Sequence, residues 1–86
     1  MTKEQQKRTL EIHFEQCYRY WKQECTDTTL AFAHSIIDIV RTCRNPFAPM
    51  GEKLDADVRK EILEKCLQEF CDNMREELDK RIEKNI

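Results

Sequence analysis

The sequence predicts an all-α fold, an antiparallel three-helix bundle with a long C-terminal helix that is completed by dimerisation. Apolar side chains recur at steps of three and four residues in three separate segments, which is the period of an amphipathic helix. The chain has 86 residues with one glycine and two prolines, too few turn residues for a sandwich or barrel. This length is that of one domain, and we expect residues 1–86 to form it.

We expect the first helix over about residues 2–25. Its apolar side chains at steps of three and four share one face: Leu10, Phe14, Cys17, Trp21 and Cys25. Thr2 is the candidate N-cap, and Gln5 stands three residues later, where its side chain completes a capping box.

The second helix is expected over about residues 28–44, with Thr26 or Asp27 as its N-cap. The link before it is short, which makes it an antiparallel neighbour of the first helix. It carries two apolar rows, one of Leu30, Ala33, Ile37 and Val40 and one of Phe32, Ile36, Ile39 and Cys43. A helix that is apolar on most sides must be covered on most sides, so we expect this helix to be the central element.

Residues 45–55 form the expected loop, because they hold both prolines and the only glycine. Pro46 ends the second helix, since the residue before a proline avoids the helical region. Phe47, Met50 and Leu54 give the loop enough apolar surface to fold back as a lid over the core. A ligand-binding loop is the alternative, because loops of this length are sometimes functional.

The third helix is expected over about residues 56–85, with Asp55 as N-cap and Asp57 in its first turn. One apolar row runs along it: Val58, Ile62, Cys66, Phe70, Met74, Leu78 and Ile82. Leu63, Leu67 and Cys71 widen this row in its first half. The row narrows after Cys71, which is typical of a helix that leaves two neighbours and meets a single partner.

The helix lengths predict a dimer. At 1.5 Å per residue the three helices are about 36, 26 and 45 Å long, so the third extends about two or three turns beyond the others. These turns carry Leu78 and Ile82, and an isolated helix end frays in water unless its apolar face is buried. A second copy would bury it, and two-fold dimers are the commonest assembly. Harmless fraying, or a first helix that covers these turns, is the alternative.

Composition narrows the location and the chemistry. The segment before Leu10 is polar and lacks the apolar stretch of a secretory signal, and no apolar run approaches the roughly 20 residues of a membrane span. The five cysteines are an odd number, which favours reduced thiols in the cytoplasm. One glycine excludes a glycine-rich phosphate loop, and the cysteines lie inside helices. We therefore expect neither catalysis nor a cofactor.

A metal site is the sharpest chemical alternative. His13 and Cys17 are four residues apart on the first helix, and His34 and Asp38 are four apart on the second. In an antiparallel hairpin the two pairs fall at similar heights, and two imidazoles, a thiolate and a carboxylate bind zinc tetrahedrally. Against this, Cys17 already belongs to the apolar row as a small hydrophobic residue, and the sequence has no standard zinc motif.

Nucleic-acid binding is a second alternative. Arg41, Arg44, Arg59 and Lys60 gather around the loop, where they would contact phosphates. The net charge of −2 gives no overall basic footprint, and acidic neighbours dilute the patch. The helix after the short link is also the most apolar of the three, unlike a DNA-recognition helix.

Protein recognition is the function that we expect. Ile12 and Tyr20 project from the polar side of the first helix, and Leu78 and Ile82 stand on the extension of the third. Tyrosine is among the residue types enriched in interface hot spots. These four residues are the expected contacts with partners, namely a second copy and a further protein. The role would be that of an adaptor, an assembly subunit or a small inhibitor made by a phage or mobile element.

Overall fold

The structure is a computed structural model that describes residues 1–45, 47, 51 and 53–84. Three helices form: α1 (Lys3–Glu24), α2 (Thr28–Arg44) and α3 (Ala56–Lys84). Within the described residues no strand is present, so the chain is all-α as expected. The helix bounds agree with the expected ones to within one residue, and residue 85 lies outside the described residues. None of the described helices is long and apolar enough to cross a membrane.

Local capping explains where the helices begin. The Thr2 hydroxyl accepts a hydrogen bond from the Gln5 N–H at 3.2 Å, and the Gln5 side chain accepts one from the Thr2 N–H at 2.9 Å. The predicted capping box is therefore confirmed. Asp27, the second of the two expected candidates, caps α2 by accepting from the N–H groups of Thr29 and Leu30. These bonds satisfy amides that have no partner within the helix.

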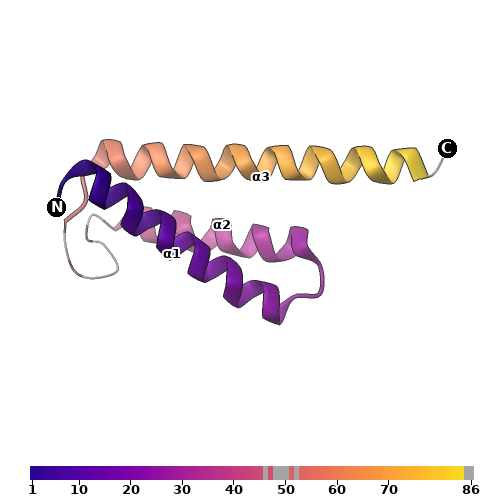
Figure 1. Cartoon of the computed structure of the whole chain (residues 1–86), viewed down its shortest axis with the longest axis horizontal. Coiled ribbons are helices and arrows are strands. Elements are labelled where there is room, and N and C mark those ends of the chain that lie inside the picture. Colours follow the sequence, from indigo (N-terminus) through magenta and orange to yellow (C-terminus); the bar gives the residue numbers. More distant parts are fainter. Residues whose placement is uncertain (46, 48–50, 52, 85–86) are drawn as a thin grey trace.

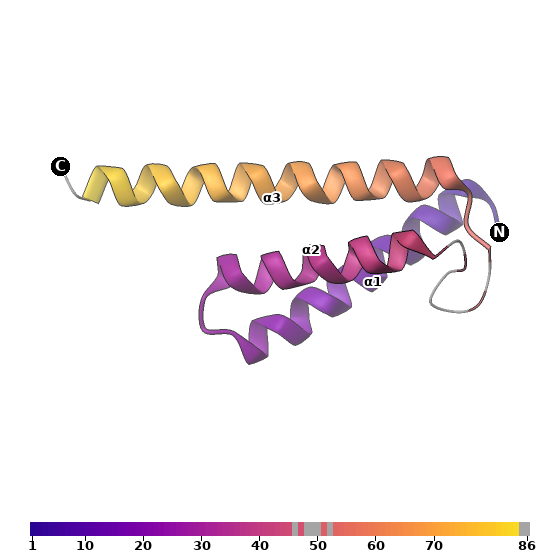
Figure 2. The same cartoon turned by 180° about the vertical axis from the view of Figure 1, so that it is seen from behind.

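The three helices are arranged as a hairpin and a long arm (Figures 1 and 2). The chain runs along α1 away from the N-terminus and returns along α2, which crosses α1 at an angle. It then passes through the loop into α3, which lies along α2 in the opposite direction. At about 1.5 Å per residue α3 is roughly 18 Å longer than α2, so its last turns extend beyond the hairpin. This extension confirms the overshoot predicted from the helix lengths.

The core lies where the three helices meet. Its buried members come from each helix and from the end of the loop: Leu10, Ile36, Ile39, Cys43, Leu54, Val58, Ile62 and Cys66. The Phe32 ring extends the core towards the hairpin turn. It packs edge-on against Phe14 and Tyr18 of α1 and stacks on Phe70 of α3, each at 5.6 Å between ring centroids. These aromatic contacts join all three helices.

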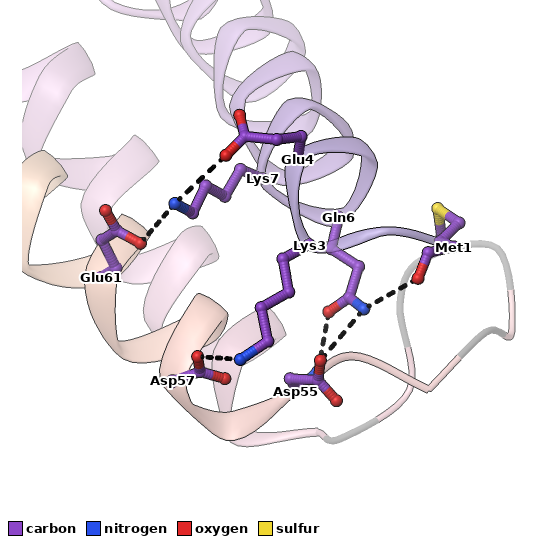
Figure 3. Close-up of polar contacts among 8 residues, drawn as sticks. All are labelled: Met1, Lys3, Glu4, Gln6, Lys7, Asp55, Asp57 and Glu61. Carbon is purple, nitrogen blue, oxygen red and sulfur yellow. Dashed lines mark hydrogen bonds and ion pairs between the residues drawn. The ribbon is translucent and has the colours of Figure 1, made fainter.

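A polar clamp fastens the start of α1 to the start of α3 (Figure 3). The Gln6 side chain is only 5% exposed, and its carbonyl accepts a hydrogen bond from the Asp55 N–H at 2.8 Å. Its amide nitrogen donates to the Asp55 carboxylate at 3.3 Å and to the Met1 carbonyl at 3.4 Å. Ion pairs from Lys3 to Asp57 (2.6 Å) and from Lys7 to Glu61 (2.9 Å) flank this clamp.

Among the described residues of the loop, Leu54 belongs to the core. Leu54 is buried, as expected of a lid, whereas Phe47 is exposed and pairs with Lys53 in an isolated β-bridge. Gly51 has a φ of 82°, a conformation that L side chains rarely adopt and that explains the glycine. The lid prediction is therefore right for Leu54 and wrong for Phe47, and Met50 lies outside the described residues.

The expectation that α2 is covered on most sides is wrong. Its row of Phe32, Ile36, Ile39 and Cys43 is buried or half-buried, but Leu30 and Ile37 of the other row are exposed. The reason is that α1 and α3 pack on adjacent sides of α2 and leave its outer side open. The outer side of α2 thus exposes apolar side chains that neither α1 nor α3 covers.

Candidate functional site

Two rows of exposed apolar side chains stand out on the surface. On α3 the row consists of Leu67, Cys71, Met74, Leu78 and Ile82, of which Leu78 is 58% exposed. On α2 Leu30 and Ile37 are 51% and 47% exposed, and Ala33 and Val40 of the same row are half-buried. Steps of three and four residues place each row on one side of its helix.

The two rows meet at the start of α2, and together we name them the α2–α3 face. Met74 and Leu78 of α3 line a shallow hollow together with Thr29 of α2. Further along α2, an open groove of about 330 Å³ is lined by α2 residues alone: Ile36, Ile37, Val40, Arg41 and Arg44. The face thus combines a hollow between the two helices with a groove on α2.

The four residues predicted to contact partners do not form one patch. Leu78 and Ile82 belong to the α2–α3 face, whereas Ile12 and Tyr20 are exposed on α1. Ile12 is two residues from the buried Leu10, which places it on nearly the opposite side of α1 from the core. Tyr20 packs edge-on against Trp21 at 5.1 Å. The α3 pair thus continues a row of exposed apolar side chains, whereas the neighbour of Tyr20 is the half-buried Trp21 ring.

The candidate metal ligands divide into two separate pairs. The His13 ring nitrogen lies 3.0 Å from the Thr42 hydroxyl and 3.8 Å from the Cys17 sulfur. The Trp21 indole engages the other pair: it stacks on His34 at 4.2 Å between ring centroids and donates a hydrogen bond to Asp38 at 2.6 Å.

Consequently the four do not converge, and the described residues contain no group of three or more metal-ligating side chains that could hold an ion. Burial and the Asp38 charge also raise the pKa of the Cys17 thiol, which disfavours the thiolate that binds zinc. The predicted zinc arrangement is therefore absent from this part of the chain.

The four candidate phosphate-binding cations are not equivalent either. Arg41, Arg44 and Lys60 are exposed, but Arg59 is half-buried and donates a hydrogen bond to the Cys43 carbonyl at 3.0 Å. That carbonyl lies in the last turn of α2, where a cation offsets the negative end of the helix dipole. Arg59 thus holds α3 to α2 through one guanidinium nitrogen, whereas its buried Nε has no hydrogen-bond partner among the described residues.

A cleft on the other side of α3 lies between α1 and α3. It has a volume of about 280 Å³ and an aromatic floor that includes Phe14, Tyr18 and Phe32. Cys66 also lines it. Burial, with the nearby Glu69 charge, raises the pKa of this thiol to about 11. At neutral pH the thiol is protonated, so it is a poor nucleophile. The five cysteines are all free.

Two parts of the α2–α3 face did not follow from the sequence pattern. Leu30 and Ile37 belong to an apolar row that was expected to be covered, and Leu67 was assigned to the core side of α3. One signal in the sequence could have identified Leu30 and Ile37. The second helix has more apolar surface than its two neighbouring helices can cover when they pack on adjacent sides of it. No family model, curated protein or solved structure matches this chain.

Proposed function

We propose that the chain is a non-enzymatic helical protein that works through protein–protein contacts, and that it associates with a second copy through the α2–α3 face. The observation that supports this proposal is the pair of exposed apolar rows, with Leu30 and Ile37 on α2 and Leu67, Met74, Leu78 and Ile82 on α3. Monomeric proteins rarely expose contiguous apolar patches of this kind, and larger ones mark interaction sites.

The apolar rows supply part of the area of a small dimer interface. They span residues 30–40 of α2 and 67–82 of α3, about 16 and 24 Å, so on helices about 10 Å wide they present roughly 400 Å² per copy. Specific interfaces bury about 800 Å² per partner, so the rows provide about half of that area and the side chains around them would supply the rest. An assembly subunit or an adaptor would keep its other surfaces, including Ile12 and Tyr20 of α1, for a further protein.

Light scattering over a concentration series tests the proposal. The full chain is expected to have the mass of a dimer, about twice 10.4 kDa. The variant Leu78→Asp with Ile82→Asp is expected to be monomeric, because each substitution places a charge in the apolar face. Both side chains are exposed in the single chain, so the variant should retain the helices of the three-helix core by circular dichroism, with any loss of helix confined to the last turns of α3.

The matched control is Ile12→Asp, which makes the same kind of change at an exposed apolar residue of α1. It is expected to remain a dimer. A full-length chain that stays monomeric at the highest concentrations would contradict self-association. Equal effects of the control and of the α3 variant would show that the α2–α3 face is not the interface.

A further inference from the structure

The apolar row of α3 has a spacing that reads the same in both directions. Its members, together with the half-buried Leu63, are Leu63, Leu67, Cys71, Met74, Leu78 and Ile82. The successive steps are four, four, three, four and four residues. A second copy of α3 that runs in the opposite direction therefore presents its side chains at matching heights. In a parallel pair the same row also matches itself, so the spacing alone does not choose between them.

The packing within one chain supplies the second observation. Phe32 of α2 stacks on Phe70 of α3, and the Cys43 carbonyl of α2 accepts from Arg59 of α3. In both pairs the two residue numbers add up to 102. Because α2 and α3 run in opposite directions, subtracting the number of an α2 residue from 102 gives the α3 residue that lies at the same height. Ile37 is thus level with residue 65 of α3, and Val40 is level with residue 62.

In an antiparallel pair that aligns the two rows, Leu63 faces Ile82 of the other copy and Leu67 faces Leu78. The numbers of two facing residues therefore always add up to 145. Ile82 of the second copy then stands at the height of Leu63, between the heights of Val40 and Ile37. That is where the open groove of about 330 Å³ lies beside α2. The extension of each copy therefore occupies the empty groove of the other. In a parallel pair both extensions would lie side by side, and both grooves would stay empty.

Charge does not choose between the two orientations. Arg41 and Arg44 are exposed at the end of this groove, in the last turn of α2. The antiparallel copy brings the C-terminal end of its α3 to this height, where the negative pole of the helix dipole is offset by Lys80 and Arg81. The orientation therefore rests on the filling of the groove.

We infer that two copies pair through α3 in an antiparallel two-fold arrangement, in which Leu67 faces Leu78 of the other copy and Ile82 enters the groove beside Ile37 and Val40. This inference rests on the proposed self-association and specifies its geometry. Two-fold interfaces use the same patch on both subunits, and this row meets that requirement by its spacing.

Disulfide trapping tests the register. In a Cys71→Ser background, Leu67→Cys and Leu78→Cys are made as separate full-length chains, and each is oxidised alone and as an equal mixture. The antiparallel register separates two copies of residue 67 by about 16 Å in height, and likewise two copies of residue 78. A disulfide needs Cα atoms within about 7 Å. Only the mixture is therefore expected to yield a cross-linked dimer, with peptide mapping placing the bond between positions 67 and 78.

The controls separate the inference from the proposal on which it rests. The Cys71→Ser parent reports any background from the remaining cysteines, and light scattering on the reduced variants shows whether they still dimerise. The pair Leu63→Cys and Ile82→Cys, mixed in the same way, is a second readout for the same register. Efficient cross-linking of either single variant alone would overturn the antiparallel register in favour of a parallel one. Reduced variants that are dimers but give no bond in either mixture would overturn the register while self-association stands.

Discussion

The buried side chain of Gln6 makes the central polar contact between the start of α1 and the segment that leads into α3. In Gln6→Ala the Asp55 N–H loses its acceptor at 2.8 Å, and the two weaker bonds to Asp55 and Met1 are lost as well. A donor left without a partner costs about 1–3 kcal/mol. Asp55 itself is exposed, so water reaches part of the vacated site. We therefore expect the lower part of that range, about 1–2 kcal/mol of unfolding free energy.

Thermal and urea unfolding followed by circular dichroism measure this loss, at one protein concentration because association adds to stability. For a domain of this size, each 1 kcal/mol corresponds to a fall of about 4–8 °C in Tm. The matched control is Gln16→Ala, the same substitution at an exposed position of α1. The control is expected to stay within about 0.5 kcal/mol of the natural chain. A Gln6→Ala variant that is as stable as the control would refute the structural role of the clamp.

The variant Gln6→Glu tests the same clamp by pH. It keeps an acceptor for the Asp55 N–H but replaces the amide donor by a carboxylate beside the Asp55 carboxylate. Repulsion raises the pKa of the introduced carboxyl in the folded state above its unfolded value of about 4.3. Its destabilising effect is therefore complete above the raised pKa, and it decreases as the pH falls towards the unfolded value. Urea unfolding at several pH values measures this change, and a penalty that is independent of pH would contradict the contact with Asp55.

Three further predictions follow from burial and charge. Leu10→Ala removes a fully buried side chain and is expected to cost about 3–5 kcal/mol in urea unfolding, whereas a loss below 1 kcal/mol would show that Leu10 is not in the core. The hydrogen bond and charge of Lys3 hold the pKa of the Asp57 carboxyl below its usual value of 3.8. Asp57 thus contributes stability that is present above this value and is lost as the pH falls through the lower folded-state pKa. Asp57→Asn should reduce the dependence of stability on pH in that window, and unchanged profiles would contradict the pair. In thiol labelling of the monomeric Leu78→Asp, Ile82→Asp variant near pH 8, the exposed Cys71 should react before the buried Cys66, whose pKa is about 11, and the reverse order would contradict the burial of Cys66.

The helices and their caps were predictable because they depend on neighbours in sequence. The capping box of Thr2 and Gln5 and the N-cap at Asp27 involve residues two or three positions apart. Gln6 was missed for the opposite reason. It stands four residues before Leu10, on the core side of α1, but its partner Asp55 is 49 residues away. No local pattern reveals such a pair.

The candidate site was predictable in part. The helix lengths pointed to Leu78 and Ile82, because an extension beyond the core follows from counting residues. Periodicity also identified both apolar rows of α2, but it could not tell which row the other helices cover. That depends on the directions from which α1 and α3 approach, and these leave Leu30 and Ile37 open. Similarly, the heights of the two predicted ligand pairs did not reveal that the Trp21 ring contacts both His34 and Asp38.

The short link between α1 and α2 and the long extension of α3 have opposite consequences for how the chain folds. The hairpin contacts join residues close in sequence, so we expect them to form early and independently of concentration. Within the described residues the extension meets only the start of α2, and a helix end without tertiary contacts is marginal in water. In the proposed dimer its ordering would wait for a collision with a second molecule. The last step of folding would be bimolecular, and its rate would rise with protein concentration.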